Sequence, residues 1–453
     1  MNWERLREKI LEENYPSKEE IDKANNLYED ISTYIRDNFD LKTYFAGSTG
    51  RKTCMSGDKD IDIFVAFSED INRKELEEKG IEIGKKVFNH FDGDYRVEYA
   101  EHPYTKGEIK GHEVEIVPCY ETDPEDIKSS VDRTPHHIKW LEQQLDEKKR
   151  EEVVILKKFL KVQDLYGSSL KVHGFSGYLC EILINYYGSF LDLMENAQNW
   201  DETEIIDPEN HHKDGLPGEL KDKFDSNLIV IDPVDPERNV ASVLSTENYS
   251  KFIYDSMNFL ESPGIDFFQD KESSFQKIAL KNEVEDRGDI IVIEFEKPDV
   301  VEDIIYPQMR RAHRWLKDVL EDEGFRIFNS GIFVGDKARI WFEMNSNLPK
   351  VKYMEGPKVF HGKKHVKQFK RKYDNVFVEE DRLKAKVERE YDDAKKLLKN
   401  FLDGDKEQLK KKGIPSHLSE KMVKYKFTDP LKENEKWLKY LAEKFQVIDN
   451  ERS

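Results

Sequence analysis

The chain has 453 residues, of which 37% are apolar or aromatic, so it can bury two to four cores, since single domains mostly run to about 100 to 200 residues. Its formal net charge of −20 counts against a protein that binds polyanions with its whole surface. No apolar run approaches the roughly 20 residues of a membrane span, and the three cysteines (Cys54, Cys119 and Cys180) lack the spacing of a disulfide frame or zinc site, which favours a reducing cytoplasm.

Residues 1–140 are predicted to form a domain of mixed α and β structure. Apolar periodicity predicts helices over residues 11–39 and 73–91, and strands over residues 60–67, 95–100 and 112–120. The next part, residues 141–268, is predicted to be mostly helical, because aromatic and apolar residues recur at helical spacing as far as about residue 200. Within this part, beyond residue 200, a loop is expected over residues 201–227, followed by a strand at NLIVIDP and a turn at VDPERN.

Residues 269–453 are predicted to contain an antiparallel sheet. The order strand, helix, strand, strand over residues 289–344 favours such a sheet with helices on one face. Charged helices are expected over residues 382–409 and 433–445.

The segment FAGSTGRKTCMSGDKDIDIFVAF, residues 45–67, places two carboxylates on one side of a strand. Alternate side chains of a strand face the same way, so Asp60, Asp62 and Phe64 share a face while the apolar residues between them pack beneath. Two neighbouring anions repel each other unless a cation lies between them, and oxygen-only ligands favour magnesium. The pattern therefore predicts a magnesium site.

A glycine-serine pair precedes the two aspartates. Gly47 lets backbone amides approach an anion, the hydroxyl of Ser48 adds a donor, and Arg51 can reach the same anion. A turn of this kind is usually structural when it stands alone. Together with the Asp-x-Asp pair at a fixed distance, however, this turn strongly indicates a functional site.

A third carboxylate is needed at a two-metal phosphoryl-transfer site, and a neighbouring strand has to supply it. The strand HEVEIVPCY offers Glu115, and Glu113 lies on the same face, so spacing alone does not choose between them. Either glutamate could equally be an exposed strand residue, which is the commoner fate of a lone glutamate.

This constellation resembles the polymerase-β nucleotidyltransferase superfamily. The blocks GSTGRKTCMSGDKDIDIFV, HPYTKG, EVEIVPCY, SVDRTPHH, GFSGYLCEILI, IDPVDPERNVA and GPKV further resemble the archaeal, class I, CCA-adding tRNA nucleotidyltransferases, in that family's order over essentially the whole chain. The resemblance implies an α+β multidomain protein. Its parts are a polymerase-β-like catalytic head with a mixed sheet (1–140), a helical neck (141–268), and an α/β tRNA-binding body with an antiparallel sheet and a basic tail (269–453).

The resemblance also implies roles for individual residues. Asp60, Asp62 and Glu115 would bind two Mg²⁺ ions, although the family usually has aspartate at the position of Glu115. The remaining matches would bind the nucleotide and its triphosphate; they are Gly47, Ser48, Arg51, His102, Thr134, His137, Lys157 and Tyr166. From the residues alone, a loop, turn, solvated or core-edge place explains His102, Thr134, Lys157 and Tyr166 as well, and His136 is an alternative to His137.

Arg238, in VDPERNVA, is the candidate for choosing the base. Cytosine and adenine share an exocyclic amine beside an unprotonated ring nitrogen, whereas uracil and guanine present a carbonyl beside a ring N–H. An arginine that donates to the ring nitrogen therefore admits CTP and ATP and rejects the others. In the family this arginine acts together with phosphates of the bound tRNA, and the alternative is a simple pair with Asp235 or Glu237.

A basic segment runs from Lys350 to Lys372, with nine Lys or Arg against one acid, Glu355. A solvated surface is the ordinary interpretation of such a run. Because the family contacts the acceptor stem and TΨC arm of tRNA, the resemblance implies that part of this contact lies here. The expected tRNA-binding residues are Lys363, Lys364, Lys367, Lys370 and Arg371.

The sequence thus predicts a cytoplasmic enzyme that adds and repairs the 3′-terminal CCA of tRNA without a template, using CTP, ATP and two Mg²⁺ ions and releasing pyrophosphate. Two alternatives are a poly(A) polymerase or other terminal ribonucleotidyltransferase of the same superfamily, and a catalytically dead RNA-binding scaffold. The intact Asp-x-Asp pair speaks against the scaffold. A homodimer is left open.

Overall fold

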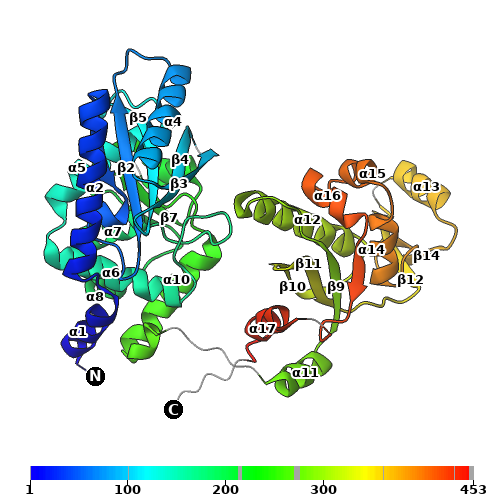
Figure 1. The fold of residues 1–453 in the computed structure, drawn as a ribbon. Helices are drawn as coiled ribbons and strands as arrows, with labels where there is room; N and C mark the ends of the chain where they lie inside the picture. The colour runs from blue at the N-terminus through cyan, green and yellow to red at the C-terminus, as the bar shows by residue number, and fades with distance from the viewer. Residues whose placement is uncertain are drawn as a thin grey trace. The chain divides into compact units, whose positions relative to one another are not determined.

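The computed structural model describes residues 2–99, 101–212, 217–269, 276–360, 362–432 and 434–447 (Figure 1). The chain divides into two compact units, one up to residue 271 and one from residue 272 onward. Mixed helices and sheets in both units agree with the predicted α+β class. The finer division of the first unit into a head and a neck remains a prediction. Within the described ranges, no helix is both long and apolar enough to cross a membrane.

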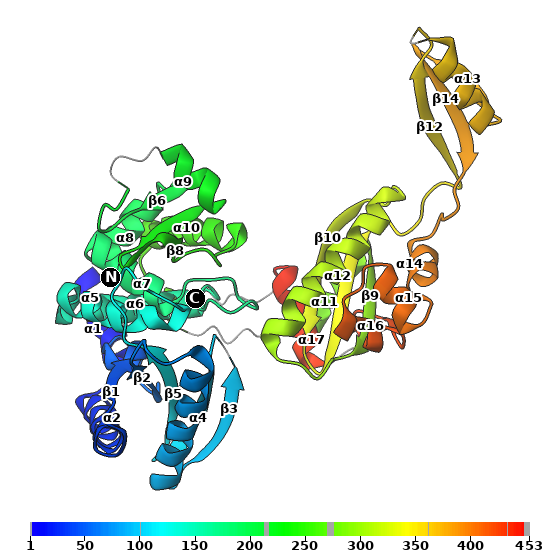
Figure 2. The same cartoon turned by 90° about the horizontal axis from the view of Figure 1, so that it is seen from above.

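A five-stranded mixed sheet, here called the head sheet, organises the first 120 residues (Figures 1 and 2). Its order is β1-β2-β5-β4-β3, with β1 at Lys42–Ala46, β2 at Asp60–Phe67, β3 at Asp94–Tyr99, β4 at Pro103–Ile109 and β5 at His112–Tyr120. Only the β2–β5 pair within this order is parallel. The sequence analysis did not anticipate β4.

Helices α2 (Lys18–Phe39) and α4 (Arg73–His90) pack on one face of the head sheet. Ile61, Ile63 and Val65 of β2 are buried in the core shared with these helices. Asp60 and Asp62 therefore lie on the opposite face, as the alternation predicts. The short helix α3 (Gly47–Gly50) links β1 to the approach of β2.

The rest of the first unit is a helical core with a small sheet. The helices are η1 (Ser130–Arg133), α5 (Thr134–Gln144), α6 (Glu147–Val162), α7 (Gly177–Tyr187), α8 (Phe190–Ala197), α9 (Pro217–Phe224), α10 (Thr246–Glu261) and η2 (Ile265–Phe267). The strands are β6 (Glu204–Ile206), β7 (Leu228–Asp232) and β8 (Asp235–Asn239). The first helix of the chain, α1 (Trp3–Asn14), joins this core through Leu6 and Ile10.

The second unit contains a four-stranded antiparallel sheet in the order β10-β11-β9-β15. These strands are β9 (Asp289–Glu296), β10 (Ile327–Val334), β11 (Lys337–Met344) and β15 (Lys426–Thr428). The prediction that helices cover one face is wrong, because both faces are covered. Ile291 and Ile293 share a core with α12 (Glu302–Asp322), α14 (Ala394–Leu402) and α16 (Ser416–Met422), whereas Val292 and Trp341 pack with α11 (Lys277–Asp286) and α17 (Glu435–Lys444).

A three-stranded antiparallel sheet with one helix forms the basic part of the second unit (Figure 2). The order is β12-β14-β13, with β12 at Val351–Lys358, β13 at Val376–Glu379 and β14 at Arg382–Glu388. Helix α13 (Lys363–Lys372) packs through Phe369, whose ring lies 2.9 Å from the position that a Cβ on Gly356 would take. The absence of a side chain at residue 356 thus lets the helix approach the sheet.

Several predicted elements differ from the structure. Residues 11–39 are not one helix, because Pro16 follows the end of α1 and Ser17 begins α2 with a capping box to Glu20. The predicted helix over 382–409 is wrong, since this stretch forms β14, α14 and α15 (Lys406–Lys411). The predicted turn VDPERN contains strand β8, and the expected loop over 201–227 contains β6 and α9; its residues 213–216 lie outside the described ranges.

Candidate active site

Two pairs of facing carboxylates lie on the exposed side of the head sheet. In the β2–β5 register Asp62 pairs with Glu115, and Asp60 pairs with Glu113. Neighbouring residues in such a register share a face of the sheet. The structure thus aligns Glu115 with the more buried of the two aspartates, because Asp62 is half-buried while Asp60 is exposed. This alignment favours Glu115 over Glu113 as the third ligand.

A lysine of the neighbouring strand joins the two glutamates. Lys106, on β4, pairs with Glu115 across the sheet. Its Nζ lies 2.5 Å from Oε1 of Glu113 and 2.7 Å from Oε1 of Glu115. Burial alone would lower the pKa of Lys106, but the bonds to both glutamates raise it above its usual value, so the side chain is a cation.

Gly47 allows the turn before α3 to approach Asp62. Its φ is 66°, in the left-handed region that favours glycine. A Cβ at this position would lie 1.8 Å from Oδ2 of Asp62, so a side chain here would force the carboxylate or the backbone to shift. The glycine of the predicted Gly-Ser pair is therefore required by its contact with the carboxylate.

The two aspartates are held in an environment that disfavours their charge. Burial, followed by the negative charge of Glu115 and then of Asp60, raises the pKa of Asp62 to about 6. Burial and the charge of Glu113 also raise the pKa of Asp60. A bound cation would relieve both effects.

The donor set fits a hard divalent cation, because it consists of carboxylate oxygens that repel each other. No group of three or more His, Cys, Asp or Glu side chains in the described part of the chain is already arranged to hold a metal ion. The ammonium group of Lys106 instead binds Glu115, the carboxylate that an ion would share with Asp62. Asp60, Asp62 and Glu115 remain the residues that could hold a metal.

Arg51 is anchored by a buried glutamate that the sequence analysis missed. Nε of Arg51 lies 3.0 Å from both carboxylate oxygens of Glu181, a fully buried residue of α7. The hydroxyl of Thr53 donates to the same carboxylate over 2.5 Å. The Nζ of Lys157 in turn donates to the carbonyl oxygen of Thr53 over 2.7 Å. These contacts tie the segment after α3 to helices α6 and α7.

Lys157 and Tyr166 lie together, as the resemblance implies. Lys157 is 1% exposed, and burial lowers its pKa below the usual value. Burial raises the pKa of Tyr166. A Cβ on Gly177 would lie 3.2 Å from the Tyr166 hydroxyl and 3.6 Å from Nζ of Lys157, so both polar groups point at the first turn of α7.

A second buried acid, Asp232 at the end of β7, binds Arg238, the residue expected to read the base, together with His137 and Tyr178. Its carboxylate accepts from Nη1 of Arg238 over 2.6 Å, from Nε2 of His137 over 3.0 Å and from the hydroxyl of Tyr178 over 3.2 Å. The rings of His137 and Tyr178 stack at 4.1 Å. Burial would raise the pKa of Asp232, but the hydrogen bonds that its carboxylate accepts and the charge of Arg238 lower this pKa to about 2. The pKa of His137 is lowered by burial.

The structure therefore joins Arg238 to a buried acid six residues away. The alternative pairing of Arg238 with Asp235 or Glu237 is wrong, because Asp235 binds Arg133 and Glu237 binds Lys223.

His102 and Thr134, two further residues expected to bind the nucleotide, lie near η1 and at the start of α5. His102 is 2% exposed, with Nδ1 lying 3.3 Å from Oε1 of Glu77 and Nε2 lying 3.2 Å from the hydroxyl of Ser129. Thr134 is the first residue of α5. These contacts link His102 to the structure around η1, and a role for either residue in nucleotide binding remains a prediction.

The expected tRNA-binding residues lie on helix α13 of the second unit. Lys363, Lys364, Lys367, Lys370 and Arg371 are all exposed. The helix has no buried residue, and its half-buried side chains, which include Val366 and Phe369, form the other side. This segregation leaves the cations to the solvent.

Four residues were missed by the sequence analysis: Thr53, Lys106, Glu181 and Asp232. The usable signal was a single acid within an apolar run, as in CEILI for Glu181 and LIVID for Asp232. A carboxylate on such a buried segment requires a positively charged or hydrogen-bonding partner from elsewhere in the fold. Lys106 lay within HPYTKG, where nothing marked its partner.

Sequence models of three families match the chain. A nucleotidyltransferase domain matches residues 28–137, the second domain of tRNA nucleotidyltransferases matches residues 151–269, and the C-terminal domain of CCA-adding enzymes matches residues 287–427. Members of the nucleotidyltransferase superfamily generally act with divalent metal ions.

Individual proteins show the same likeness. The CCA-adding enzyme of Methanocaldococcus jannaschii is 40% identical over 428 residues, which cover 92% of this chain and 94% of that protein. That of Archaeoglobus fulgidus is 39% identical over 374 residues, 82% of each. A solved structure of a cytoplasmic RNA terminal U-transferase covers 59% of this chain and 98% of its own, with 12% identity and a TM-score of 0.46. The chain therefore belongs to the family of CCA-adding enzymes, which are tRNA nucleotidyltransferases.

Proposed function

We propose that this protein adds and repairs the 3′-terminal CCA of tRNA without a nucleic-acid template, from CTP and ATP and with release of pyrophosphate. The observation that carries the proposal is the alignment of Glu115 with Asp62 across β2 and β5, beside the turn at Gly47. Family membership supplies the substrate class. The three free, buried cysteines support action in a reducing cytoplasm.

Asp60, Asp62 and Glu115 would hold two Mg²⁺ ions. When bound, such ions activate the attacking 3′-hydroxyl and stabilise the leaving pyrophosphate. The protein contributes to this step by presenting ionised carboxylates in a fixed position. The parallel register fixes Glu115 against Asp62, and Gly47 leaves the space that the Asp62 carboxylate occupies.

We assign the triphosphate to the side of the site that holds Gly47, Ser48 and Arg51. Glu181 binds Nε of Arg51, and this orients the terminal nitrogens of the guanidinium group to donate to phosphate oxygens. Lys157 and Tyr166 lie near the first turn of α7, where the positive end of the helix dipole also favours an anion. His102, Thr134 and His137 complete the pocket on the resemblance alone.

Arg238 would select the base. Its position is supported by Asp232, which also accepts hydrogen bonds from His137 and Tyr178. An N–H of Arg238 can donate to the unprotonated ring nitrogen of cytosine or adenine. In uracil or guanine the corresponding nitrogen carries a proton, so two donors would face each other, and this mismatch disfavours UTP and GTP.

The acceptor stem and TΨC arm of tRNA would contact the exposed cations of α13. Six exposed Lys and Arg side chains on one short helix, the five expected residues and Lys372, suit phosphates of an A-form stem, which is recognised by shape and charge rather than by sequence. The contact is confined to a small basic surface, because the chain as a whole carries a net charge of −20.

The test uses the full-length protein with a tRNA that lacks its CCA end. With labelled CTP alone, we expect two residues to be added and the reaction to stop, and ATP then to add one. Asp62→Ala should abolish pyrophosphate release. The matched control is Asp94→Ala, which removes an exposed acid of β3 from the same face and should leave turnover unchanged.

Other outcomes would contradict the proposal in distinct ways. Extension with ATP but none with CTP would identify a poly(A)-type enzyme. Equal turnover by wild type and Asp62→Ala would remove Asp62 from the mechanism, and no turnover by either would favour the scaffold.

A further inference from the structure

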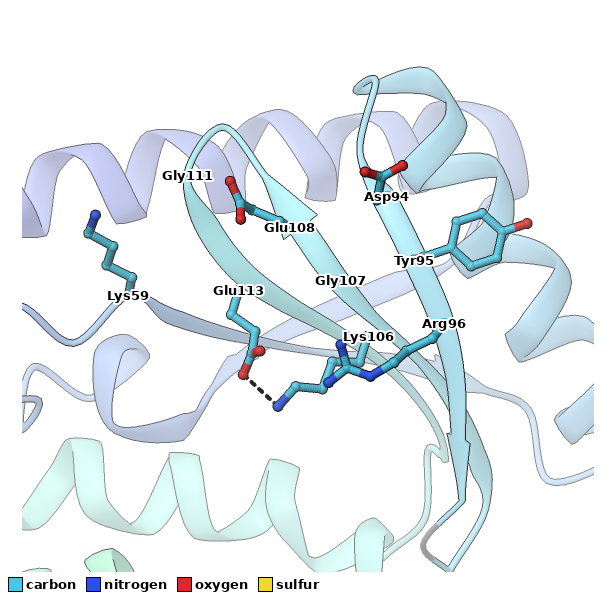
Figure 3. Close-up of a pocket in the computed structure, with 9 residues that line it drawn as sticks. All are labelled: Lys59, Asp94, Tyr95, Arg96, Lys106, Gly107, Glu108, Gly111 and Glu113. Carbon is cyan, nitrogen blue, oxygen red and sulfur yellow. Dashed lines mark ion pairs between the residues drawn. The ribbon is translucent and has the colours of Figure 1, made fainter. Parts of the chain in front are cut away.

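A row of charged side chains crosses the head sheet from strand to strand. In register, Asp62 of β2 pairs with Glu115 of β5, Glu115 with Lys106 of β4, and Lys106 with Arg96 of β3. The row therefore runs from two acids to two bases. Lys106 is the base that adjoins the acids, and Figure 3 shows its side chain directed at Glu113.

The neighbouring row consists of acids alone: Asp60, Glu113, Glu108 and Asp94. Charges this close together on one face repel each other, so the sheet requires a cation between the rows. Arg96 is tied to Glu98 over 2.6 Å, at the far edge of the sheet. Lys106, which is 18% exposed and bridges Glu113 and Glu115, supplies the charge beside the catalytic face.

The position of Lys106 conflicts with metal binding at the proposed site. Its ammonium group lies 2.7 Å from Oε1 of Glu115, so the lysine and a metal ion compete for the same carboxylate. Glu113 offers Lys106 a second partner at 2.5 Å that does not depend on Glu115. A cavity of about 710 Å³ is lined by Lys106, Arg96 and Glu113, which leaves the side chain room to move (Figure 3).

We propose that Lys106 is a positioning residue that holds Glu115 in place before the metal ion binds and then remains on Glu113 alone. The proposal rests on the proposed metal site and adds a role for two residues, Lys106 and Glu113, that do not touch substrate. Glu113 binds the ammonium group of Lys106 when the metal ion occupies Glu115. Because Glu113 holds the lysine, Lys106 competes less strongly with the metal ion for the carboxylate of Glu115.

The test measures Mn²⁺ binding to the full-length protein without nucleotide, by the electron paramagnetic resonance signal of free Mn²⁺. Lys106→Met removes the competitor, so the protein should bind Mn²⁺ about tenfold more tightly, the scale of an outer-shell partner. Glu113→Gln leaves Lys106 on Glu115 alone, and Mn²⁺ should bind about tenfold more weakly. Lys110→Met is the matched control, because Lys110 lies in the same hairpin and binds Asp30 instead.

The double variant distinguishes a transfer of Lys106 from Glu115 to Glu113 from a general effect of charge on Mn²⁺ affinity. If Glu113 acts through Lys106, Glu113→Gln should change Mn²⁺ affinity much less in the Lys106→Met background than in wild type. An equal change in both backgrounds would overturn the inference, as would unchanged or weaker Mn²⁺ binding by Lys106→Met. Either result would leave the proposed function standing as long as wild type binds Mn²⁺ and Asp62→Ala does not. Absence of Mn²⁺ binding by wild type would overturn both.

Discussion

The charge on Asp62 should destabilise the metal-free protein at neutral pH. Burial and the neighbouring acids raise the pKa of Asp62 to about 6, whereas its ordinary value is 3.8. The folded state therefore binds a proton more tightly than the unfolded state does. It follows that the stabilisation from a protonated Asp62 is complete below about pH 4 and is lost as the pH rises through about 6.

The size of this effect follows from the shift. A difference of about two pKa units corresponds to about 3 kcal/mol, since one unit is about 1.4 kcal/mol. Asp62→Asn keeps the shape of the side chain and removes its charge. Between pH 4 and pH 7, the free energy of unfolding of the variant should therefore gain about 3 kcal/mol relative to wild type.

Hydrogen exchange provides the measurement, because it reports the opening of one strand in a chain that divides into two compact units. The protection of a peptide covering β2 is followed with EDTA at each pH, after correction for the intrinsic exchange rate. Asp94→Asn, which alters an exposed acid on the same face, is the control and should behave like wild type. Added Mn²⁺ should raise protection in wild type and not in Asp62→Asn.

A constant difference between wild type and Asp62→Asn from pH 4 to pH 7 would refute the reasoning. It would mean that the carboxylate of Asp62 is not penalised by its surroundings. The argument that a cation relieves repulsion at this site would then lose its basis.

Two further predictions concern the candidate active site, and two concern the second unit. Gly47→Ala should lower kcat/KM about 100-fold, since the new methyl group must displace the carboxylate of Asp62 by an ångström or more; unchanged kinetics would contradict this. Asp232→Asn frees Arg238 and should reduce the preference for CTP over UTP roughly tenfold, the effect of about 1.4 kcal/mol, in competition assays. Changing the five expected tRNA-binding residues of α13 to Gln should raise KM for tRNA and flatten its dependence on salt, with kcat retained. Burial lowers the pKa of His313 to about 4 from 6.5, so as pH falls from 6.5 to 4 the region around α12 should lose about 3 kcal/mol relative to His313→Leu, measured by hydrogen exchange of a peptide covering α12.

The sequence predicted the parts of the site that depend on neighbouring residues in one strand. Alternation alone placed Asp60 and Asp62 on the polar face and Ile61 beneath them, and the structure confirms it. The partners of Arg51 and Arg238 could not be found in this way. Glu181 and Asp232 reach those arginines only through tertiary packing, and their local sequences are those of an apolar helix and a buried strand.

The error over residues 382–409 has a different cause. RLKAKVE alternates polar and apolar residues with period two, and Leu383 and Ala385 are indeed buried in β14. Its Lys, Glu and Ala content favours a helix in isolation. Pairing with β12, about thirty residues earlier, overrides it. For this segment, the two-residue alternation of buried and exposed side chains indicates the structure better than its amino-acid composition does.

Helix α1 has a consequence for how the protein is made. Trp3 stacks on Phe190 at 5.5 Å, and Arg7 binds Glu152 of α6 over 2.6 Å. The binding partners of α1 thus lie about 140 to 190 residues downstream, so α1 leaves the ribosome well before them. The strands of the head sheet are synthesised in the interval and can pair while α1 waits without its apolar neighbours. During translation, closure of the helical core must therefore wait until α6 and α8 have been synthesised, so a change in the contacts of α1 would interfere with late maturation rather than with early folding.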